Sequence, residues 1–334
     1  MSYRIGINGF GRIGRMVLRR SLTVPEVDVV AVNDLADIGD LAYLLKYDSV
    51  HGVFPGEVGH DASSLQVGGQ TISFFSERSP ADIPWDGADV DVVIDATGAF
   101  RSREAASRHL RGRVRKVLIS APSDNMDVTI VPGVNDAQYD PEHHQVISMA
   151  SCTTNSLAPV AKVLQDHFGI VHLFITTVHA YTASQSIMDK PTRKRRRGRA
   201  GALSMIPTST GAAQATAQVI PELAGKMDGM AIRVPIPDGS VTDIVAELAT
   251  PTRADAINDC LREAAQKPPL KGIMAYSEEE LVSIDIVGNP HSSIVDAPST
   301  RVLNGTMAKL LAWYDNEWGY ACRLTEFAGR LIER

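Results

Sequence analysis

The stretch Tyr3-Arg-Ile-Gly-Ile-Asn-Gly-Phe-Gly-Arg-Ile-Gly14 decides the fold of this chain. Its first residues alternate as in a β-strand, and the residues that follow, up to Leu22, repeat apolar side chains at helical spacing. Between the two, Gly9 permits a tight turn, Gly11 lets the backbone approach a pyrophosphate, and Gly14 lets the helix pack closely on the strand. The free N–H groups at the positive end of the helix would face the phosphates, so the stretch predicts a dinucleotide site.

An acidic residue follows at the expected distance. A second predicted strand, Val27–Asn33, ends beside Asp34, which lies 20 residues beyond Gly14. A carboxylate there accepts hydrogen bonds from both ribose hydroxyls and repels a 2′-phosphate, which favours NAD over NADP. The glycines alone are also compatible with a merely structural turn. The flanking strand and helix favour the dinucleotide site.

The two halves of the chain differ near residue 150. The first half alternates predicted strands with helical patterns, which favours a parallel sheet with helices on both faces. Its predicted strands are Arg4–Asn8, Val27–Asn33, Val90–Asp95, Lys116–Ser120, Thr129–Val131 and Val146–Met149.

The second half is dominated by strands, with two clear helices, one after Cys152 and one at Ala254–Gln266. In Val241–Leu248 the residues alternate as in a sheet with two unlike faces. The other strands predicted here are Ile170–His179, Met230–Val234 and Val282–Val287. The last segment, Glu317–Ile332, carries an apolar stripe that needs a partner surface, and we expect the first domain to supply it.

Composition limits the classes of protein that the chain can belong to. The 334 residues are 44% hydrophobic and 22% charged with a net charge of -6, as in a globular protein of about two domains. The acidic balance gives no reason to expect a nucleic acid or an anionic membrane as partner. Three cysteines argue against a disulfide framework. No apolar run approaches about 18 residues and no signal-peptide pattern is present, so we expect a cytoplasmic protein.

Cys152 differs from the other two cysteines, which lie within helical patterns and resemble buried apolar residues. Ser151 is a natural N-cap, which puts Cys152 in the first turn of a helix, where amide dipoles stabilise a thiolate and lower the thiol pKa. A nucleophilic thiol needs a base. His179 ends a long strand and opens a polar loop, but the residues alone leave its pairing with Cys152 open. No cluster with metal-ligand spacing is found.

Two further segments suit anions. The basic run Arg193–Arg199 has three interpretations: a nuclear or nucleic-acid signal, a solvated loop, or a phosphate-binding or interface segment. The acidic chain and the absence of interleaved aromatic residues favour the third. Thr208–Gly211 precedes an Ala-rich helical pattern, Ala212–Val219, and is either a second anion-binding helix start or an ordinary cap.

Together these segments resemble phosphorylating glyceraldehyde-3-phosphate dehydrogenase, from end to end and in the expected order. The residues that carry the resemblance are Asn8-Gly-Phe-Gly-Arg-Ile-Gly-Arg15, Leu44-Leu-Lys-Tyr-Asp-Ser-Val-His-Gly52, Ala150-Ser-Cys-Thr-Thr-Asn155, Ile206-Pro-Thr-Ser-Thr-Gly-Ala212 and Trp313-Tyr-Asp-Asn-Glu-Trp-Gly-Tyr320.

The resemblance implies a Rossmann-type NAD-binding domain of residues 1–151 and 317–334, and an α+β catalytic domain of residues 152–316 with a mostly antiparallel sheet. It implies that Cys152 is the nucleophile and His179 the base. The implied cofactor contacts are Gly9, Gly11, Arg12, Ile13, Gly14, Asp34, Arg78, Thr97, Ser120 and Asn316. The implied contacts of the substrate phosphate are Thr182, Arg197 and Arg233, and those of the attacking phosphate are Ser151, Thr153, Thr210 and Gly211. The family is tetrameric, which implies a homotetramer.

Three departures from the family pattern stand out. Ser184 replaces an Asp near the substrate phosphate. Lys190 replaces a Leu near the adenosine ribose and could reach a 2′-phosphate, so some use of NADP is expected beside NAD. The loop Arg193–Arg199 is more basic than is usual in the family.

Other families remain as alternatives. Erythrose-4-phosphate dehydrogenase shares the cysteine motif but typically lacks the Thr-Gly pair that this chain keeps at Thr210-Gly211. Aspartate-semialdehyde dehydrogenase lacks the segment Trp313–Tyr320. A redox-sensing or nucleic-acid-binding relative would not need Cys152, His179 and Asn316 together.

Overall fold

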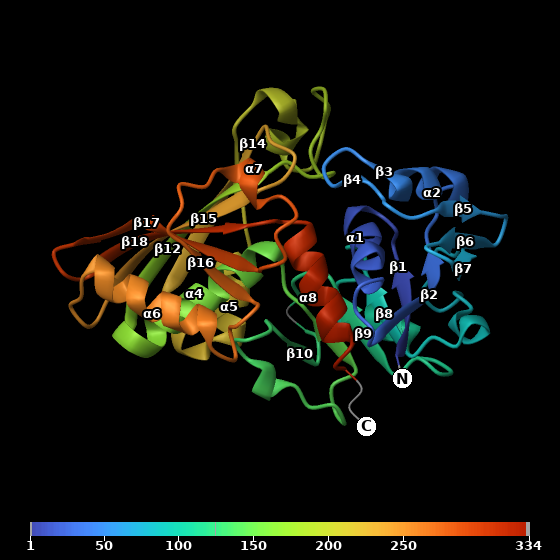
Figure 1. Ribbon diagram of the computed structural model, residues 1–334, viewed down its shortest axis with the longest axis horizontal. Coiled ribbons are helices and arrows are strands. Elements are labelled where there is room, and N and C mark those ends of the chain that lie inside the picture. The colour runs from blue at the N-terminus through green and yellow to red at the C-terminus, as the bar shows by residue number, and fades with distance from the viewer. Residues whose placement is uncertain (1, 124, 332–334) are drawn as a thin grey trace. The chain divides into compact units, whose positions relative to one another are not determined.

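The computed structural model describes residues 2–123 and 125–331, which form two compact units (Figure 1). The first unit comprises Met1–Ile130, Ala137–Ala150 and Tyr320–Arg334, and the second comprises Val131–Asp136 and Ser151–Gly319. Within the described residues, no helix is long and apolar enough to cross a membrane.

A nine-stranded sheet forms the centre of the first unit, and its first seven strands in spatial order run parallel, as predicted. Only the last two strands, at one edge, pair antiparallel. All four residues of β8 are buried, so both faces of the sheet are covered at its centre. In spatial order the strands are β10 (Val128–Thr129), β11 (Val146–Ser148), β9 (Lys116–Ile119), β8 (Val92–Asp95), β1 (Tyr3–Asn8), β2 (Val27–Asn33), β7 (Gln70–Phe75), β6 (Ser64–Val67) and β5 (Val58–His60).

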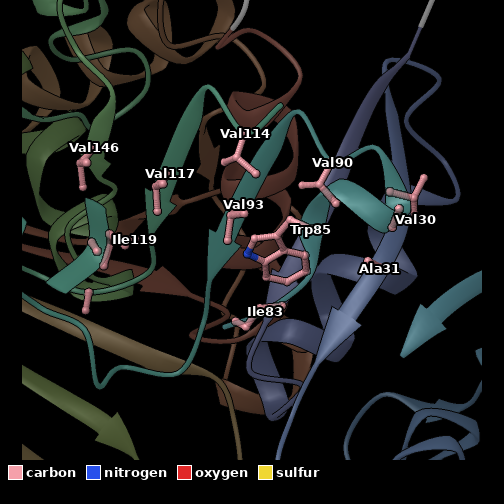
Figure 2. Packing of buried hydrophobic residues seen from close by; sticks show 13 residues of the cluster. Val30, Ala31, Ile83, Trp85, Val90, Val93, Val114, Val117, Ile119 and Val146 are labelled. Carbon is pink, nitrogen blue, oxygen red and sulfur yellow. The ribbon is translucent and has the colours of Figure 1, made fainter. Parts of the chain in front are cut away.

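One face of this sheet packs around Trp85, which is fully buried among valines and isoleucines of β2, β8, β9 and β11 (Figure 2). The other elements of the unit are short. They are α1 (Arg12–Ser21), α2 (Ile38–Lys46), α3 (Arg103–Ala106), the 3-10 turns η1 (Trp85–Ala88), η2 (Ser107–His109) and η3 (Asp136–Gln138), and the two-stranded pair β3 (Tyr47–Asp48) and β4 (Gly52–Val53).

The apolar stripe of the C-terminal segment packs within the first unit, as the sequence predicted. From Tyr320 onward, helix α8 (Trp318–Ala328) belongs to that unit. Its stripe is buried: Tyr320, Leu324, Phe327, Ala328 and Leu331 are at most 4% exposed. The ring of Phe327 packs edge-on against that of Tyr139 at 5.7 Å.

A seven-stranded sheet forms the second unit, and four of its six strand pairs are antiparallel, in agreement with the predicted fold class. Helices α4 (Cys152–Phe168), α5 (Ala212–Val219) and α6 (Ala254–Gln266) pack on the sheet (Figure 1). In spatial order the strands are β13 (Ile206–Ser209), β14 (Met227–Val234), β12 (Ile170–Ala180), β15 (Ser240–Leu248), β18 (Met307–Tyr314), β17 (Ser293–Leu303) and β16 (Met274–Ser277). The short turns are η4 (Arg195–Gly198), η5 (Gly201–Leu203) and η6 (Pro221–Leu223).

The predicted strand Val282–Val287 is wrong, because the structure has a short helix there, α7 (Ser283–Ile286). The Asp285 carboxylate accepts a hydrogen bond from the Val282 N–H at 2.9 Å and so closes the first helical turn. The apolar alternation that suggested a strand does not reflect burial, since Val282 is 56% and Ile284 70% exposed.

Candidate active site

The glycine-rich turn of the first unit has the geometry that its sequence demands. Gly9 has a φ of +90°, and a Cβ there would lie 2.8 Å from the backbone N of Thr97. A Cβ on Gly14 would lie 2.2 Å from the carbonyl oxygen of Gly9, so helix α1 approaches β1 as closely as only glycine allows. At Gly11 a Cβ would meet nothing within 4 Å. The backbone there is open to a ligand.

A cavity of about 400 Å³ lies beside this turn and is lined by Gly9, Gly11, Asp34, Arg78 and Thr97 among others. The Asp34 carboxylate lies at its wall and accepts hydrogen bonds from the Phe10 N–H at 2.6 Å and the Ala36 N–H at 2.9 Å. The open backbone at Gly11 and the carboxylate at Asp34 fit the pyrophosphate and ribose of a dinucleotide.

Five residues of the predicted cofactor set lie outside the lining of this cavity: Arg12, Ile13, Gly14, Ser120 and Asn316. The Arg12 guanidinium binds the buried carboxylate of Asp48, with Nη1 to Oδ2 at 2.6 Å. The backbone N–H of Ser120 donates to the Asp95 carbonyl at 3.0 Å.

Cys152 and His179 come together in the second unit. Cys152 is the first residue of α4, and Ser151 is the N-cap, as predicted, with its Oγ accepting from the Thr154 N–H at 3.2 Å. His179 is the penultimate residue of β12. Its Nε2 lies 3.6 Å from the Cys152 Sγ. The pairing that the residues alone left open is therefore present in the geometry.

The other ring nitrogen of His179 has two neighbours of opposite character. Nδ1 lies 2.7 Å from the Ala180 carbonyl oxygen, an acceptor, and 2.6 Å from Nη1 of Arg233, a donor. Arg233 Nη1 also donates to the Ala180 carbonyl at 2.8 Å. Strand register explains the meeting, because Arg233 of β14 is the parallel-sheet partner of His179 in β12. A proton on Nδ1 is accepted by Ala180, which leaves the Nε2 lone pair facing the sulfur.

The structure contradicts the predicted low pKa of Cys152. Burial raises the pKa of the thiol to about 11, although the charge of Arg233 and hydrogen bonds with Thr153 act in the opposite direction. Burial, followed by the charge of Arg233, lowers the pKa of His179 to about 3. Both shifts favour a neutral thiol beside a neutral imidazole, because desolvation penalises the thiolate more than the Arg233 guanidinium and the hydrogen bonds with Thr153 stabilise it.

Tyr314 belongs to this site, although the sequence did not indicate it as a functional residue. Its buried hydroxyl lies 2.9 Å from Thr153 Oγ1 and 2.7 Å from Thr177 Oγ1. Its ring packs edge-on against the imidazole of His179 at 5.9 Å. Tyr314 therefore links the start of the cysteine helix to the strand of the histidine. Tyr314 lies in the segment Trp313–Tyr320 that carries the family resemblance, but its residue type alone did not indicate this role.

Four of the seven predicted phosphate contacts form two local groups, and the other three, Arg233, Ser151 and Thr153, have their printed contacts around Cys152 and His179 instead. In the first, Arg197 donates through Nε to Thr208 Oγ1 at 3.0 Å and lies 3.5 Å from Ser184 Oγ, which in turn lies 2.9 Å from Thr182 Oγ1. In the second, Gly211 is the N-cap of α5, and Thr210 Oγ1 accepts from the Ala212 N–H at 3.2 Å. Hydroxyls and donors dominate both groups, as an anion requires.

The basic loop Arg193–Arg199 is held by backbone hydrogen bonds and by side-chain contacts. The Lys190 N–H donates to the Gly198 carbonyl at 2.9 Å, and a Cβ on Gly198 would lie 2.2 Å from the Lys190 carbonyl oxygen. Arg199 pairs with Asp189 at 2.8 Å, and Lys194 donates to Ser209 Oγ at 2.8 Å.

Asn316 lies in the second unit, just after β18, and is almost fully buried. Its backbone N–H donates to Asp238 Oδ1 at 3.2 Å. Burial and the adjacent Asp315 raise the pKa of Asp238 well above the ordinary value of a carboxyl.

Comparison with known proteins agrees with this architecture. Residues 3–103 match the family "Glyceraldehyde 3-phosphate dehydrogenase, NAD binding domain", and residues 151–316 match "Glyceraldehyde 3-phosphate dehydrogenase, C-terminal domain". Glyceraldehyde-3-phosphate dehydrogenase from Geobacillus stearothermophilus and glyceraldehyde-3-phosphate dehydrogenase 1 from Bacillus subtilis are each 52% identical over 334 residues, covering 100% of this chain and 99% of the relative. Glyceraldehyde-3-phosphate dehydrogenase 2 from Streptomyces avermitilis is 52% identical over 98% of this chain and 97% of its own length. The chain belongs to the glyceraldehyde-3-phosphate dehydrogenase family.

Proposed function

We propose that the chain oxidises D-glyceraldehyde 3-phosphate to 1,3-bisphosphoglycerate with NAD and inorganic phosphate, reversibly, in glycolysis and gluconeogenesis. The observation that carries the proposal is the 3.6 Å contact between Cys152 Sγ and His179 Nε2, at a helix start beside the cationic Arg233. Family membership supports the substrate and the cofactor.

The first step joins the sulfur to the aldehyde. His179 takes the thiol proton at Nε2 as Cys152 Sγ adds to the carbonyl carbon, and the proton then passes to the former carbonyl oxygen, giving a thiohemiacetal. This step uses the tautomer whose Nδ1 proton is accepted by the Ala180 carbonyl. The neutral thiol and imidazole of the free site are its starting state.

In the second step His179 removes the hydroxyl proton while a hydride leaves the same carbon, and a thioester on Cys152 results. NAD, when bound, supplies the nicotinamide that accepts the hydride. Inorganic phosphate then adds to the thioester carbon and the Cys152 thiolate leaves, so that the product is an acyl phosphate.

We assign the anion contacts as the resemblance implies. Thr182, Arg197 and Arg233 hold the substrate phosphate, and Ser151, Thr153, Thr210 and Gly211 hold the attacking phosphate. The partners of the two arginines support this assignment, because none of them carries a negative charge. Arg197 contacts hydroxyls, and Arg233 contacts an imidazole and a carbonyl. The Nε of Arg233 is buried without a hydrogen-bond partner among the described residues. An anion would satisfy it.

For the cofactor we propose Gly9, Gly11, Gly14, Asp34, Arg78 and Thr97 in residues 1–151, with Arg12, Ile13 and Ser120 as further contacts. Asn316 holds the carboxamide of the nicotinamide. Residues 317–334 complete this domain, and residues 152–316 form the catalytic domain. Lys190 adds a weak capacity for NADP.

The assay that tests the function follows NADH formation from glyceraldehyde 3-phosphate, with and without inorganic phosphate, and again with NADP. We expect sustained turnover that requires phosphate and prefers NAD. Equal turnover without phosphate would mean that water cleaves the thioester, as in the erythrose-4-phosphate type of enzyme. No turnover would contradict the proposal.

We also propose a cytoplasmic homotetramer without a nucleic-acid or membrane partner. The loop that follows β12 exposes Ile187 (85%), Met188 (75%), Leu203 (84%) and Met205 (74%). Apolar side chains so close in sequence and so exposed support the proposal that another subunit contacts this surface. Light scattering coupled to size exclusion tests this, and a monomer would contradict it.

A further inference from the structure

Ser240 lies where three neighbouring strands of the second sheet end at the same edge. It is the first residue of β15, beside the last residue of β12, Ala180, and opposite the last residue of β18, Tyr314. Asn316 follows β18 by two residues. Ser240 is fully buried. Its hydroxyl therefore has to find its partners within the protein.

The hydroxyl of Ser240 has two partners, and they differ in role. The Ala180 N–H donates to Ser240 Oγ at 3.1 Å, so the serine oxygen acts as an acceptor there. The serine proton is then donated to Oδ1 of Asn316, with an Oγ–Oδ1 distance of 2.5 Å. The result is a directed chain of hydrogen bonds from a backbone amide through a serine to a side-chain amide.

This chain sets the orientation of the Asn316 carboxamide. Its O and NH₂ groups are nearly the same size, so packing alone does not distinguish them. Because Ser240 donates, Oδ1 faces the serine, and Nδ2, which has no partner among the described residues, is the atom left to donate to a ligand. The backbone of Asn316 is held separately, by Asp238.

We propose that Ser240 is a positioning residue that presents the Asn316 Nδ2–H₂ to the carboxamide of the nicotinamide and thereby fixes which face of the ring receives the hydride. The inference rests on the proposed role of Asn316. It also ties the orientation of the cofactor to the strand of His179, since Ala180 contacts Ser240 through its N–H and His179 through its carbonyl.

The test compares Ser240→Ala with wild type and with a matched control, Ser293→Ala. Ser293 is also a fully buried serine at the start of a strand of this sheet, and its Oγ has no partner among the described residues. The readouts are KM for NAD, kcat, and the side of C4 on which deuterium from [1-²H]glyceraldehyde 3-phosphate appears in the NADH, read by ¹H NMR.

We expect Ser240→Ala to raise KM for NAD by about 3- to 10-fold, the effect of one neutral hydrogen bond, and to place deuterium on both sides of C4. Wild type and Ser293→Ala should label one side. Unchanged KM and single-sided labelling in Ser240→Ala would overturn the proposal. Failure of wild type to reduce NAD would instead overturn the proposed function.

A second pair of variants separates the hydroxyl from packing, in case Ser240→Ala does not fold. Ser240→Thr and Ser240→Val differ only in a hydroxyl and a methyl group. We expect the threonine variant to keep single-sided labelling and the valine variant to lose it. The same labelling and the same KM in both variants would show that the hydroxyl does not position Asn316.

Discussion

Two buried histidines, one in each unit, show how surroundings decide what an imidazole can do. His109 is fully buried and His179 is 5% exposed, and each packs near an aromatic ring, Trp85 or Tyr314 respectively. In His109, Nδ1 accepts from the Trp85 indole N–H at 3.1 Å and Nε2 lies 3.3 Å from the Asp95 carboxylate. Indole can only donate and carboxylate can only accept, so His109 has one tautomer.

The contacts of His179 do not fix its tautomer in this way. Its Nδ1 meets an acceptor, the Ala180 carbonyl, and a donor, the Arg233 guanidinium, while its Nε2 faces a thiol. Either tautomer therefore has a partner. A histidine that takes up a proton and gives it back needs this freedom, whereas a structural histidine gains from its absence.

The largest effect should come from the group that His179 faces. Cys152→Ala removes the atom that carries the acyl group, so turnover of glyceraldehyde 3-phosphate should be lost. NAD binding, measured by calorimetry, should remain, because the glycine turn and its cavity are unaltered. Substantial dehydrogenase activity in this variant would remove Cys152 from the role of nucleophile.

His179→Asn should come next, with kcat reduced by about 10²–10⁴-fold, the usual contribution of a general base. The remaining activity should rise with pH, since hydroxide replaces the lost base in part. Steady-state kinetics at saturating NAD and phosphate measure the loss. A reduction below about tenfold would make His179 a structural residue and would end the contrast with His109.

His109→Leu should show the opposite profile. The substitution leaves the Trp85 N–H without an acceptor inside the core and removes one donor from Asp95, which also holds Thr97 and Asn8. We expect the free energy of unfolding to fall by about 1–3 kcal/mol, with kcat at saturating NAD close to that of wild type. Urea denaturation at fixed protein concentration measures the first quantity. Unchanged stability would mean that the hydrogen bonds of His109 contribute nothing.

Sequence reasoning singled out His179 among the histidines only by its position. His179 stood out because it ends a strand next to a polar loop. The bounds of some elements were predictable to the residue, since Val27–Asn33 matches strand β2 and Ala254–Gln266 matches helix α6. The apolar alternation of Val282–Val287 wrongly predicted a strand. Its side chains Val282 and Ile284 are exposed, and a capping hydrogen bond with Asp285 stabilises a short helix instead.

Sequence reasoning missed Ser240 and Tyr314 as residues of the site, and the contact between Arg233 and His179, because all of these depend on strand register. Ser240 and Tyr314 are partners across β15 and β18, and Arg233 and His179 are partners across β14 and β12. Each pair is separated by more than 50 residues in the chain. A serine or a tyrosine at a strand end has no sequence pattern of its own, so its part in a site emerges only when the strands pair. The thiol pKa was mispredicted for a related reason, since burial comes from the whole unit and the helix start from a few residues.

The smallest effect concerns stability in acid. The pKa of His179 is lowered to about 3 when folded, from 6.5 in the unfolded chain. Between these values the unfolded state binds a proton that the folded state does not, so this contribution to stability is complete above pH 6.5 and is lost as the pH falls toward 3. At pH 5 the loss amounts to about 2 kcal/mol.

The variant His179→Asn lacks this titration, whereas the other groups titrate in both proteins. The free energy of unfolding of wild type, by urea titration at several pH values, should therefore fall more steeply than that of the variant between pH 6.5 and 5. Parallel curves would mean that the imidazole of His179 takes up a proton as readily in the folded protein as in the unfolded chain. Burial would then not keep this side chain neutral.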